Sequence, residues 1–384
     1  MAHLHPPPAV LEIAERLERA GFESWCVGGA IRDALLGHAH LDWDLATSAT
    51  PAEVRDIFGG RRTVPVGISF GTVGVLDRDG RMHEVTTFRR DVRTDGRHAE
   101  VEFGVSLDDD LARRDFTINA IAYSPRTGEL RDPFDGQGDL TRRVVRAVGD
   151  PRQRMLEDRL RALRAIRFAA RFDFTIEPDT LAAIAESAPY LGRLSPERVK
   201  QELDKTMEQV RCPGGALRLW QSTGAFATLI PALANVPASA LTVPDFLAMP
   251  GPRNRPARRA IRLAGLLVNL GARNAVQVLT ALRSSRQELQ RVGALVERWT
   301  VVGEEMTTAL LGGAGSVGGA DIRRWVATIG RLEVPGFMRL ASGIWAARRA
   351  EGTPAPRAAD VHALHRRLLR SAFADPVDLG ALAI

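Results

Sequence analysis

Cysteine is scarce in this chain of 384 residues, and it has no long apolar stretch. Only Cys26 and Cys212 are present, which excludes a fold held together by several disulfides and suits a reducing cytoplasm. The most apolar stretch, residues 227–249, contains three prolines, Asn235 and Asp245, so we do not expect it to span a bilayer. The N-terminus lacks the basic and apolar segments of a secretory signal. We therefore expect a cytoplasmic protein with no membrane partner.

Lysine is also rare, although the chain is basic. Its formal charge is +6 and its pI is about 10.2. Lys200 and Lys205 are the only lysines, so nearly all of the 52 basic residues are arginine. Arginine makes bidentate contacts with phosphate and stacks on bases, but an arginine bias along a whole chain can equally reflect genome composition. The charge therefore gives only weak support for a polyanionic partner.

Residues 26–47 read CVGGAIRDALLGHAHLDWDLAT, and the other segments are interpreted around them. Gly28 and Gly29 precede a short amphipathic segment that carries Arg32 and predicts a helix. A glycine pair before a helix lets backbone N–H groups approach a phosphate closely, and the helix N-terminus favours its negative charge. Taken alone, such a pair is more often an ordinary turn.

Two aspartates, Asp42 and Asp44, follow this segment. If they lie on a strand, both carboxylates point to one face, where their oxygens suit Mg²⁺. The spacing alone is common at solvated strand ends, but together with the glycine turn it suggests chemistry on a nucleoside triphosphate. Phosphoryl transfer with two metal ions is expected to use a third carboxylate. The candidates for it are Glu84 first, and then Asp77, Asp79 and Glu102.

A second cluster, RRDFTINA, occupies residues 113–120. Its residue types suit a nucleotide, with Arg114 for phosphate oxygens and with Asp115 and Asn119 for ribose hydroxyls. Taken alone, these residues are more typical of a surface salt-bridge patch that caps a helix.

A third cluster, EDRLRALRAIR, occupies residues 157–167. On a helix, Asp158 and Arg161 are neighbours at i and i+3. A carboxylate beside a guanidinium matches the Watson–Crick edges of cytosine and adenine, which pair an amino donor with a ring-nitrogen acceptor. Uracil and guanine present the opposite polarity, and mispaired polar groups would reject them. The cluster therefore predicts selection of C and A.

The next two arginines of this segment follow at the same spacing. Steps of three residues fall short of a full turn, so Arg164 and Arg167 spiral round the helix. Arg164 is the expected direct ligand of a nucleotide. Arg167 falls on the apolar stripe, and it is either a buried structural arginine or a phosphate ligand at the junction with the first domain.

The pattern of elements changes near residue 150. Residues before it alternate short strand-like and helical runs and predict a small α/β domain with a mixed sheet. Within it, residues 91–100 (DVRTDGRHAE) are polar without periodicity and predict a mobile loop beside the sheet. Residues after 150 predict helices throughout, and residues 231–256, with six prolines, are the best candidate for a linker.

In this order, the segments resemble the class II tRNA nucleotidyltransferase and poly(A) polymerase family. The resemblance rests on VGGAIRDALLG with DWDLAT, TTFRRDV with DGRH, RRDFTINA, DPFDGQGDL, EDRLRALRAIRFAARFDFTI and SPERVKQEL. These motifs cover roughly residues 20–210. It implies an α+β protein with a polymerase-β-like head over residues 1–150, which carries the mixed sheet. An all-helical neck for base recognition (151–250) and a body and tail that bind tRNA (251–384) would follow.

The resemblance also implies site residues. It places the metal ligands on Asp42 and Asp44. It places nucleotide contacts on Gly29, Arg32, Arg114, Asp158, Arg161, Arg164 and Arg167.

The activity implied is addition of C, C and then A to the 3′ end of tRNA without a nucleic-acid template. The substrates would be CTP and ATP, the metal Mg²⁺ (two ions), and the RNA contacts the 3′ end and the acceptor and T-arm backbone. Alternatives within the family are an A-adding or C-adding partial enzyme and a poly(A) polymerase. Residues 91–103 resemble the mobile loop of complete CCA-adding members. A non-catalytic RNA-binding protein is a further alternative, against which Asp42 and Asp44 argue. The oligomeric state stays open.

Overall fold

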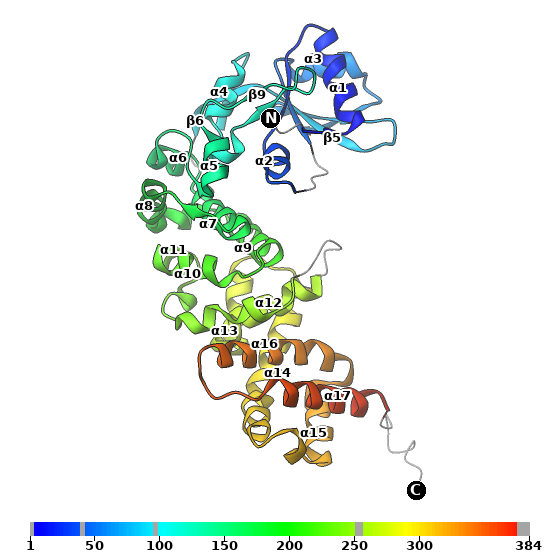
Figure 1. The fold of residues 1–384 in the computed structure, drawn as a ribbon, viewed down its shortest axis with the longest axis vertical. Helices are drawn as coiled ribbons and strands as arrows, with labels where there is room; N and C mark the ends of the chain where they lie inside the picture. The colour runs from blue at the N-terminus through cyan, green and yellow to red at the C-terminus, as the bar shows by residue number, and fades with distance from the viewer. Residues whose placement is uncertain (1–3, 39–42, 95–98, 250–255, 375–384) are drawn as a thin grey trace. The chain divides into compact units, whose positions relative to one another are not determined.

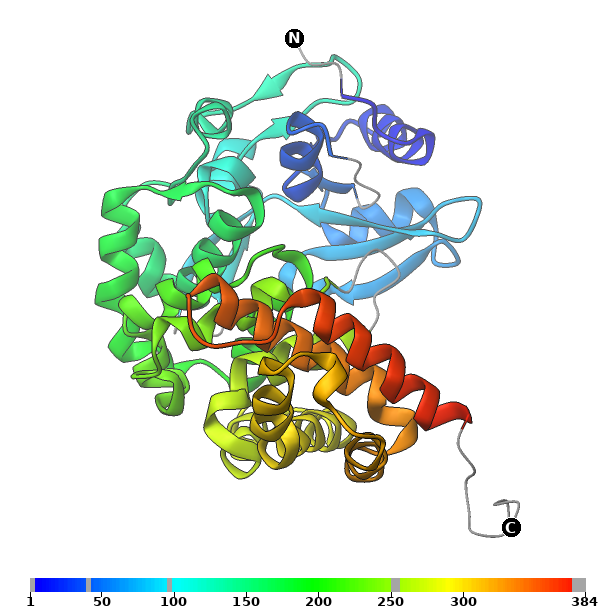
Figure 2. The same ribbon diagram turned by 60° about the horizontal axis from the view of Figure 1, so that its bottom comes forward.

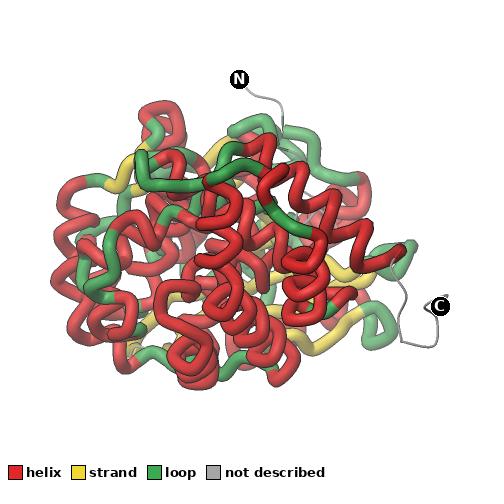
Figure 3. Tube along the Cα trace, turned by 90° about the horizontal axis from the view of Figure 1, so that it is seen from below, coloured by secondary structure: helices red, strands yellow, loops and turns green. Residues whose placement is uncertain are grey.

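The computed structural model describes residues 4–38, 43–94, 99–249 and 256–374 (Figure 1). Its contacts divide the chain into two compact units, Met1–Leu194 and Ser195–Ile384. Within the described residues every strand belongs to the first unit, and helices make up most of the rest (Figure 3). None of the described helices combines the length and the apolar character needed to cross a bilayer. The finer division at residues 150 and 250 stays a prediction.

A mixed seven-stranded sheet forms the centre of the first unit, in the order β3-β4-β5-β2-β1-β8-β9. Only β2 and β5 pair in parallel, and the other neighbours in this sheet are antiparallel. The predicted mixed sheet is therefore confirmed. Its strands are β1 (Ser24–Val27), β2 (Asp44–Thr47), β3 (Thr63–Gly67), β4 (Thr72–Leu76), β5 (Met82–Thr87), β8 (Ala122–Tyr123) and β9 (Leu130–Arg131).

Short helices pack against this sheet (Figure 1). In α1 (Pro8–Arg19) the apolar side chains recur every three or four residues, and the four at Val10, Ile13, Ala14 and Leu17 are all buried, as an amphipathic helix requires. The other two helices before β3 are α2 (Gly29–Leu35) and α3 (Pro51–Phe58). A core that includes Val27, Ala46, Phe88 and Leu111 lies between the sheet and α4 (Leu107–Ala112).

Part of the segment predicted as a mobile loop forms a β-ribbon, so the loop assignment was wrong for residues 91–94 and 99–100, while the mobility of the segment stays a prediction. Strand β6 (Arg89–Thr94) pairs antiparallel with β7 (Ala99–Phe103) in a separate two-stranded sheet. Residues 95–98, at the centre of the predicted loop, lie outside the described residues. Backbone hydrogen bonds hold such a ribbon together, so its side chains need no apolar alternation, and the polar sequence concealed it.

The first unit ends in helices and short strands. These are η2 (Thr117–Asn119), α5 (Gly136–Arg142), β10 (Val144–Val145), α6 (Pro151–Glu157), α7 (Leu160–Phe172), β11 (Thr175–Ile176), α8 (Pro178–Ser187) and η3 (Ala188–Arg193).

The second unit is helical in its described residues, as predicted. Its α-helices are α9 (Pro196–Gln209), α10 (Gly214–Ser222), α11 (Ala225–Leu229), α12 (Pro256–Leu267), α13 (Gly271–Ala281), α14 (Arg286–Leu311), α15 (Gly319–Ile329), α16 (Val334–Ala350) and α17 (Ala358–Ala374). Helices α16 and α17 lie side by side (Figure 2). Aromatic side chains fill the core, where the ring of Trp299 contacts those of Phe337 and Trp345.

One buried arginine joins three segments of the second unit. Arg262 of α12 is 1% exposed, and its guanidinium donates to the carbonyl oxygens of Met207 (2.8 Å), Val210 (2.7 Å) and Leu247 (2.9 Å). It also donates to that of Arg211 (2.8 Å). Burial lowers the pKa of Arg262 to about 10, which leaves it charged at neutral pH. The last carbonyls of a helix have no partner within it, and here Arg262 supplies donors at the end of α9.

Candidate active site

Asp44 and Glu84 lie on adjacent parallel strands of the first unit. Asp44 begins β2 and is exposed, whereas Leu45 after it is buried. Leu45 pairs with Val85 of β5, so the same register places Asp44 beside Glu84, which is also exposed. Both residues line a cavity of about 940 Å³. The structure thus brings two of the three predicted carboxylates together, while Asp42 lies outside the described residues.

The weaker candidates for the third carboxylate have other partners or positions. Asp77 accepts hydrogen bonds from the backbone N–H groups of Asp79 and Arg81, and its Oδ2 lies 3.0 Å from Nε2 of His83. The contact with His83 is the main cause that lowers the pKa of Asp77. Glu102 lies on β7 of the ribbon, where it pairs with Arg90 at 2.7 Å. Glu84 stays the predicted third carboxylate.

The glycine turn meets Arg114. Gly28 has φ +79°, a left-handed conformation that favours glycine, and a Cβ built there would lie 3.3 Å from Nη1 of Arg114. Nη2 of Arg114 donates to Asp110 at 2.9 Å, whereas its buried Nε has no hydrogen-bond partner. The backbone of Gly28, which carries no side chain, therefore lies next to the guanidinium of Arg114, which has an unused donor. This arrangement suits an anionic group.

A hydrogen-bonded network, buried at Arg32 and Asn119, connects the predicted nucleotide residues. Arg32 donates to Oδ1 of Asp33 (2.8 Å) and to Oδ1 of Asn119 (2.5 Å). Asn119 in turn donates to Oδ1 of Asp115 (2.8 Å), and Arg164 donates to Oδ2 of Asp115 from Nε (2.9 Å) and Nη2 (2.7 Å). The network therefore links α2, η2 and α7.

Burial and neighbouring charges set the pKa values of Asp115 and Arg32 in this network. Burial acts to raise the pKa of Asp115, but Arg164 and the hydrogen bond from Asn119 outweigh it and hold the pKa below its usual range. Burial lowers the pKa of Arg32, against the opposing effect of Asp33. Asp115 is therefore a carboxylate at neutral pH.

The guanidinium of Arg32 is buried and contacts other side chains of the protein. Arg32 is 4% exposed, and its guanidinium lies over the rings of Phe168 (5.0 Å) and Phe172 (4.7 Å) of α7. Cation–π contacts of this kind add to the hydrogen bonds to Asp33 and Asn119. Arg32 thus fixes α2 to α7, and its direct contact with a nucleotide stays a prediction.

The interpretation of Asp158 and Arg161 as neighbours on one helix was wrong. Helix α6 ends at Glu157 and α7 begins at Leu160. Between them Asp158 is extended, with φ −147° and ψ 104°, and its Oδ1 accepts from the backbone N–H of Leu160 at 3.0 Å. An aspartate that satisfies a first-turn N–H is typical helix-start chemistry, and it competes with a continuous helix.

Arg161 has other partners. Its Nη1 donates to Oε2 of Glu157 at 2.8 Å, and its Nη2 donates to the carbonyl oxygen of Arg113 at 2.9 Å. The side chain is 10% exposed. The structure therefore holds Arg161 against the cluster at residues 113–120, next to the site.

The two later arginines of α7 differ in burial. The side chain of Arg164 is 29% exposed, beside Asp115. Arg167 is 3% exposed, and its guanidinium lies 4.4 Å from the centre of the Phe168 ring. Arg167 is therefore buried, as one of the two predicted alternatives has it, and its contact with phosphate stays a prediction.

Comparisons with known proteins show the family of this chain. Residues 24–146 match the family model "Poly A polymerase head domain", and residues 173–236 match "Probable RNA and SrmB- binding site of polymerase A". The crystal structure of the Bacillus stearothermophilus CCA-adding enzyme in complex with CTP is 32% identical, with a TM-score of 0.72 over 96% of this chain and 83% of that one. The chain belongs to the tRNA nucleotidyltransferase and poly(A) polymerase family.

Other members of this family differ in how far the match extends. The CCA-adding enzyme of Enterococcus faecalis is 50% identical over 208 residues, which are 53% of this chain and 50% of that protein. That of Limosilactobacillus fermentum is 48% identical over 200 residues, 51% and 48% of the two chains. The chain thus spans about half the length of the curated relatives it matches. A second solved CCA-adding enzyme, 21% identical with a TM-score of 0.74 over 98% of this chain and 86% of that one, supports the fold.

Two acidic residues of this family member were missed by the sequence reasoning. Asp110 is 1% exposed and accepts from both Arg113 (2.8 Å) and Arg114 (2.9 Å). Burial acts to raise the pKa of Asp110, but Arg114 and Arg113 outweigh it and lower the pKa. Its spacing of three and four residues from these arginines was the available signal. Glu157, four residues before Arg161, carried the same signal.

Proposed function

We propose that this protein adds C, C and A to the 3′ end of tRNA without a nucleic-acid template, using CTP and ATP and releasing pyrophosphate. The observation that carries the proposal is the exposed pair Asp44 and Glu84, on adjacent strands of a chain that belongs to this family. Two relatives that are 50% and 48% identical over the matched residues are CCA-adding enzymes. This similarity favours addition of the complete CCA sequence over partial addition and over poly(A) synthesis.

The proposed metal is Mg²⁺, with two ions held by Asp42 and Asp44 and with Glu84 as the third carboxylate. The donor set fits, because Asp44 and Glu84 present carboxylate oxygens to an open cavity and Mg²⁺ prefers oxygen ligands. When bound, Mg²⁺ supplies Lewis acidity for the attacking 3′-hydroxyl and neutralises charge on the triphosphate.

The protein's own groups would position the triphosphate. The backbone of Gly28 and Gly29 and the guanidinium of Arg114 form the phosphate cradle, which is supported by the 3.3 Å approach and the unpartnered Nε of Arg114. Preorganised donors of this kind stabilise developing charge without reorganising. Asp115 and Asn119 would orient Arg164 and Arg32 for the nucleotide, and Arg167 would hold α7 in place.

We further propose that Asp158 and Arg161 select the base, because the backbone N–H of Arg161 donates to the carbonyl oxygen of Asp158 at 3.0 Å and keeps the two residues adjacent even though they do not share one helix. Arg161→Ala is expected to relax discrimination against UTP by about 10- to 100-fold, since a mispaired buried polar group costs about 1–3 kcal/mol. The measurement is kcat/KM for CTP and for UTP on a tRNA transcript that lacks CCA.

Arg159→Ala is the matched control for this prediction, because Arg159 donates to Ser187 Oγ (3.0 Å) instead. An unchanged ratio of kcat/KM for CTP and UTP in Arg161→Ala would remove Arg161 from base selection.

The proposed partner is tRNA, bound through its 3′ end and the backbone of the acceptor and T arms, in the cytoplasm. Arginines of the helical unit would contact the RNA backbone. Contacts with phosphates release counterions, so the affinity for tRNA should fall steeply as salt rises.

Addition to three versions of one tRNA transcript tests the proposed function. The transcripts lack CCA, end in C or end in CC, and each receives CTP, ATP or both with Mg²⁺. The proposal predicts that with both nucleotides all three end at CCA and then stop. Extension of the CC-ended transcript alone would indicate an A-adding enzyme, and long A tails a poly(A) polymerase. No Mg²⁺-dependent addition to any transcript would overturn the catalytic proposal.

A further inference from the structure

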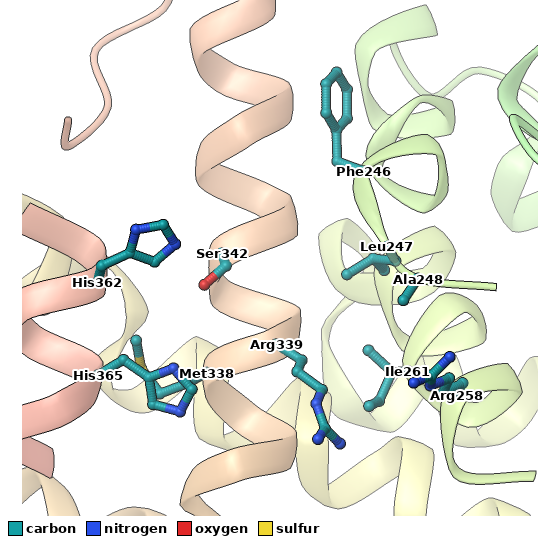
Figure 4. A pocket seen from close by; sticks show the side chains of 10 residues that line it. All are labelled: Phe246, Leu247, Ala248, Arg258, Ile261, Met338, Arg339, Ser342, His362 and His365. Carbon is teal, nitrogen blue, oxygen red and sulfur yellow. The ribbon is translucent and has the colours of Figure 1, made fainter. Parts of the chain in front are cut away.

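A second pocket lies wholly within the second, helical unit and shares no residue with the candidate active site. It has a volume of about 250 Å³ and is formed by residues 246–248 and by helices α12, α16 and α17 (Figure 4). Its apolar lining includes Leu247, Ile261 and Met338, all of them buried. Phe246, 43% exposed, adds an accessible aromatic ring.

The polar lining of this pocket is basic. Arg258, Arg339, His362 and His365 line it together with Ser342, and no carboxylate does so among the described residues. Figure 4 shows His362 of α17 pointing toward Ser342 of α16. Two guanidinium groups beside the imidazoles repel a metal cation, so the arrangement suits an anion.

Several donors in this pocket are unused. Arg339 and His362 make no hydrogen bond or ion pair with any part of the described chain, and Arg258 makes one, to the carbonyl oxygen of Met249 at 2.9 Å. Nε2 of His365 is buried without a hydrogen-bond partner. Burial, with Arg339 and His362, lowers the pKa of His365, so its ring is neutral at neutral pH. Buried polar atoms normally have partners, and a ligand would supply the missing one.

We propose that this pocket binds a nucleotide, with its phosphate on Arg339 and Arg258 and its base against the apolar wall beside Phe246. The aromatic ring favours a nucleotide over a simple phosphate ester, because bases stack on exposed aromatic side chains. The volume lies just below the range typical of ligand pockets, so the pocket would enclose only part of a nucleotide. The nucleotide is either free in solution or one residue of a bound RNA.

Equilibrium dialysis with radiolabelled AMP tests the pocket in the full-length protein. Arg339→Gln and, separately, His362→Gln are compared with Arg366→Gln, a matched control because Arg366 is exposed on α17 and does not line the pocket. All three side chains are exposed, so the fold should persist, which thermal unfolding checks. Losing the guanidinium of Arg339, a charged hydrogen-bond donor, should weaken AMP binding about tenfold or more, and losing the imidazole of His362 should weaken it by about two- to tenfold. AMP bound at the active site would be unaffected by either substitution.

A tRNA transcript that lacks CCA distinguishes the two sources of the nucleotide. Weaker AMP binding with unchanged tRNA affinity, relative to Arg366→Gln, would support the pocket with a free nucleotide as its ligand. A loss of tRNA affinity in both Arg339→Gln and His362→Gln, beyond that of Arg366→Gln, would support it with an RNA residue as its ligand. AMP and tRNA affinities equal to those of the control would overturn the proposal. Binding needs no catalysis, so this outcome is independent of the proposed function.

Discussion

Asp44→Asn is expected to lower nucleotide addition by a factor on the order of 10³, since a metal-ligating carboxylate supplies several kcal/mol of charge stabilisation in phosphoryl transfer. The substitution keeps the size of the side chain but removes its charge. Asp44 is exposed at the start of β2, so the fold should persist. The measurement is the single-turnover rate of CTP addition to a tRNA that lacks CCA, with tRNA affinity measured in parallel.

Two other acids lining the same cavity complete this experiment. Glu84→Gln should also slow addition, because the pairing of β2 with β5 places Glu84 beside Asp44, whereas Asp79→Asn, in the turn between β4 and β5, should leave the rate near that of the wild type. Affinity for tRNA should stay within about twofold in all three variants, since most RNA affinity comes from contacts with basic groups. Loss of addition and tRNA binding together in Asp44→Asn would indicate misfolding and would remove the assigned role.

Arg262→Met is expected to lower the free energy of unfolding of the helical unit by about 3–5 kcal/mol. Four backbone carbonyl groups would lose their donor, and each buried acceptor left unsatisfied costs about 1–3 kcal/mol. Removing the buried charge of Arg262 recovers part of this free energy, so the net loss of stability stays below the sum of the four separate costs. A urea titration followed by far-ultraviolet circular dichroism measures the change.

Arg291→Met is the control for this substitution, because Arg291 is exposed on α14. It should change the free energy of unfolding by less than about 0.5 kcal/mol, as surface substitutions usually do. Equal stability of the two variants would mean that water or other donors replace Arg262, and its role in joining α9 to α12 would be discarded.

Much of the candidate site could be predicted from local sequence, but the contacts that assemble it could not. Gly28 stands before a helix as predicted, and its left-handed φ explains why glycine is needed there. Its closeness to Arg114, 86 residues later, depends on tertiary packing that no local pattern encodes. The place of Glu84 beside Asp44 depends in the same way on the parallel pairing of β2 with β5.

The errors have local physical causes. The spacing of Asp158 and Arg161 assumed an unbroken helix, whereas the carboxylate of Asp158 bonds a first-turn N–H of α7. Short polar side chains offer the backbone this alternative to a continuing helix. For the ribbon β6–β7, backbone pairing formed strands where the side chains showed no strand pattern.

Crystals of the full chain with CTP and Mn²⁺ in place of Mg²⁺ would locate the metal and the nucleotide relative to Asp44 and Arg114. Without an acceptor RNA the nucleotide is not consumed, and the anomalous signal of Mn²⁺ locates the metal. We expect Mn²⁺ on the carboxylates of Asp42 and Asp44, with the triphosphate against the Gly28 turn and Arg114. Mn²⁺ and triphosphate bound away from these residues would contradict this expectation.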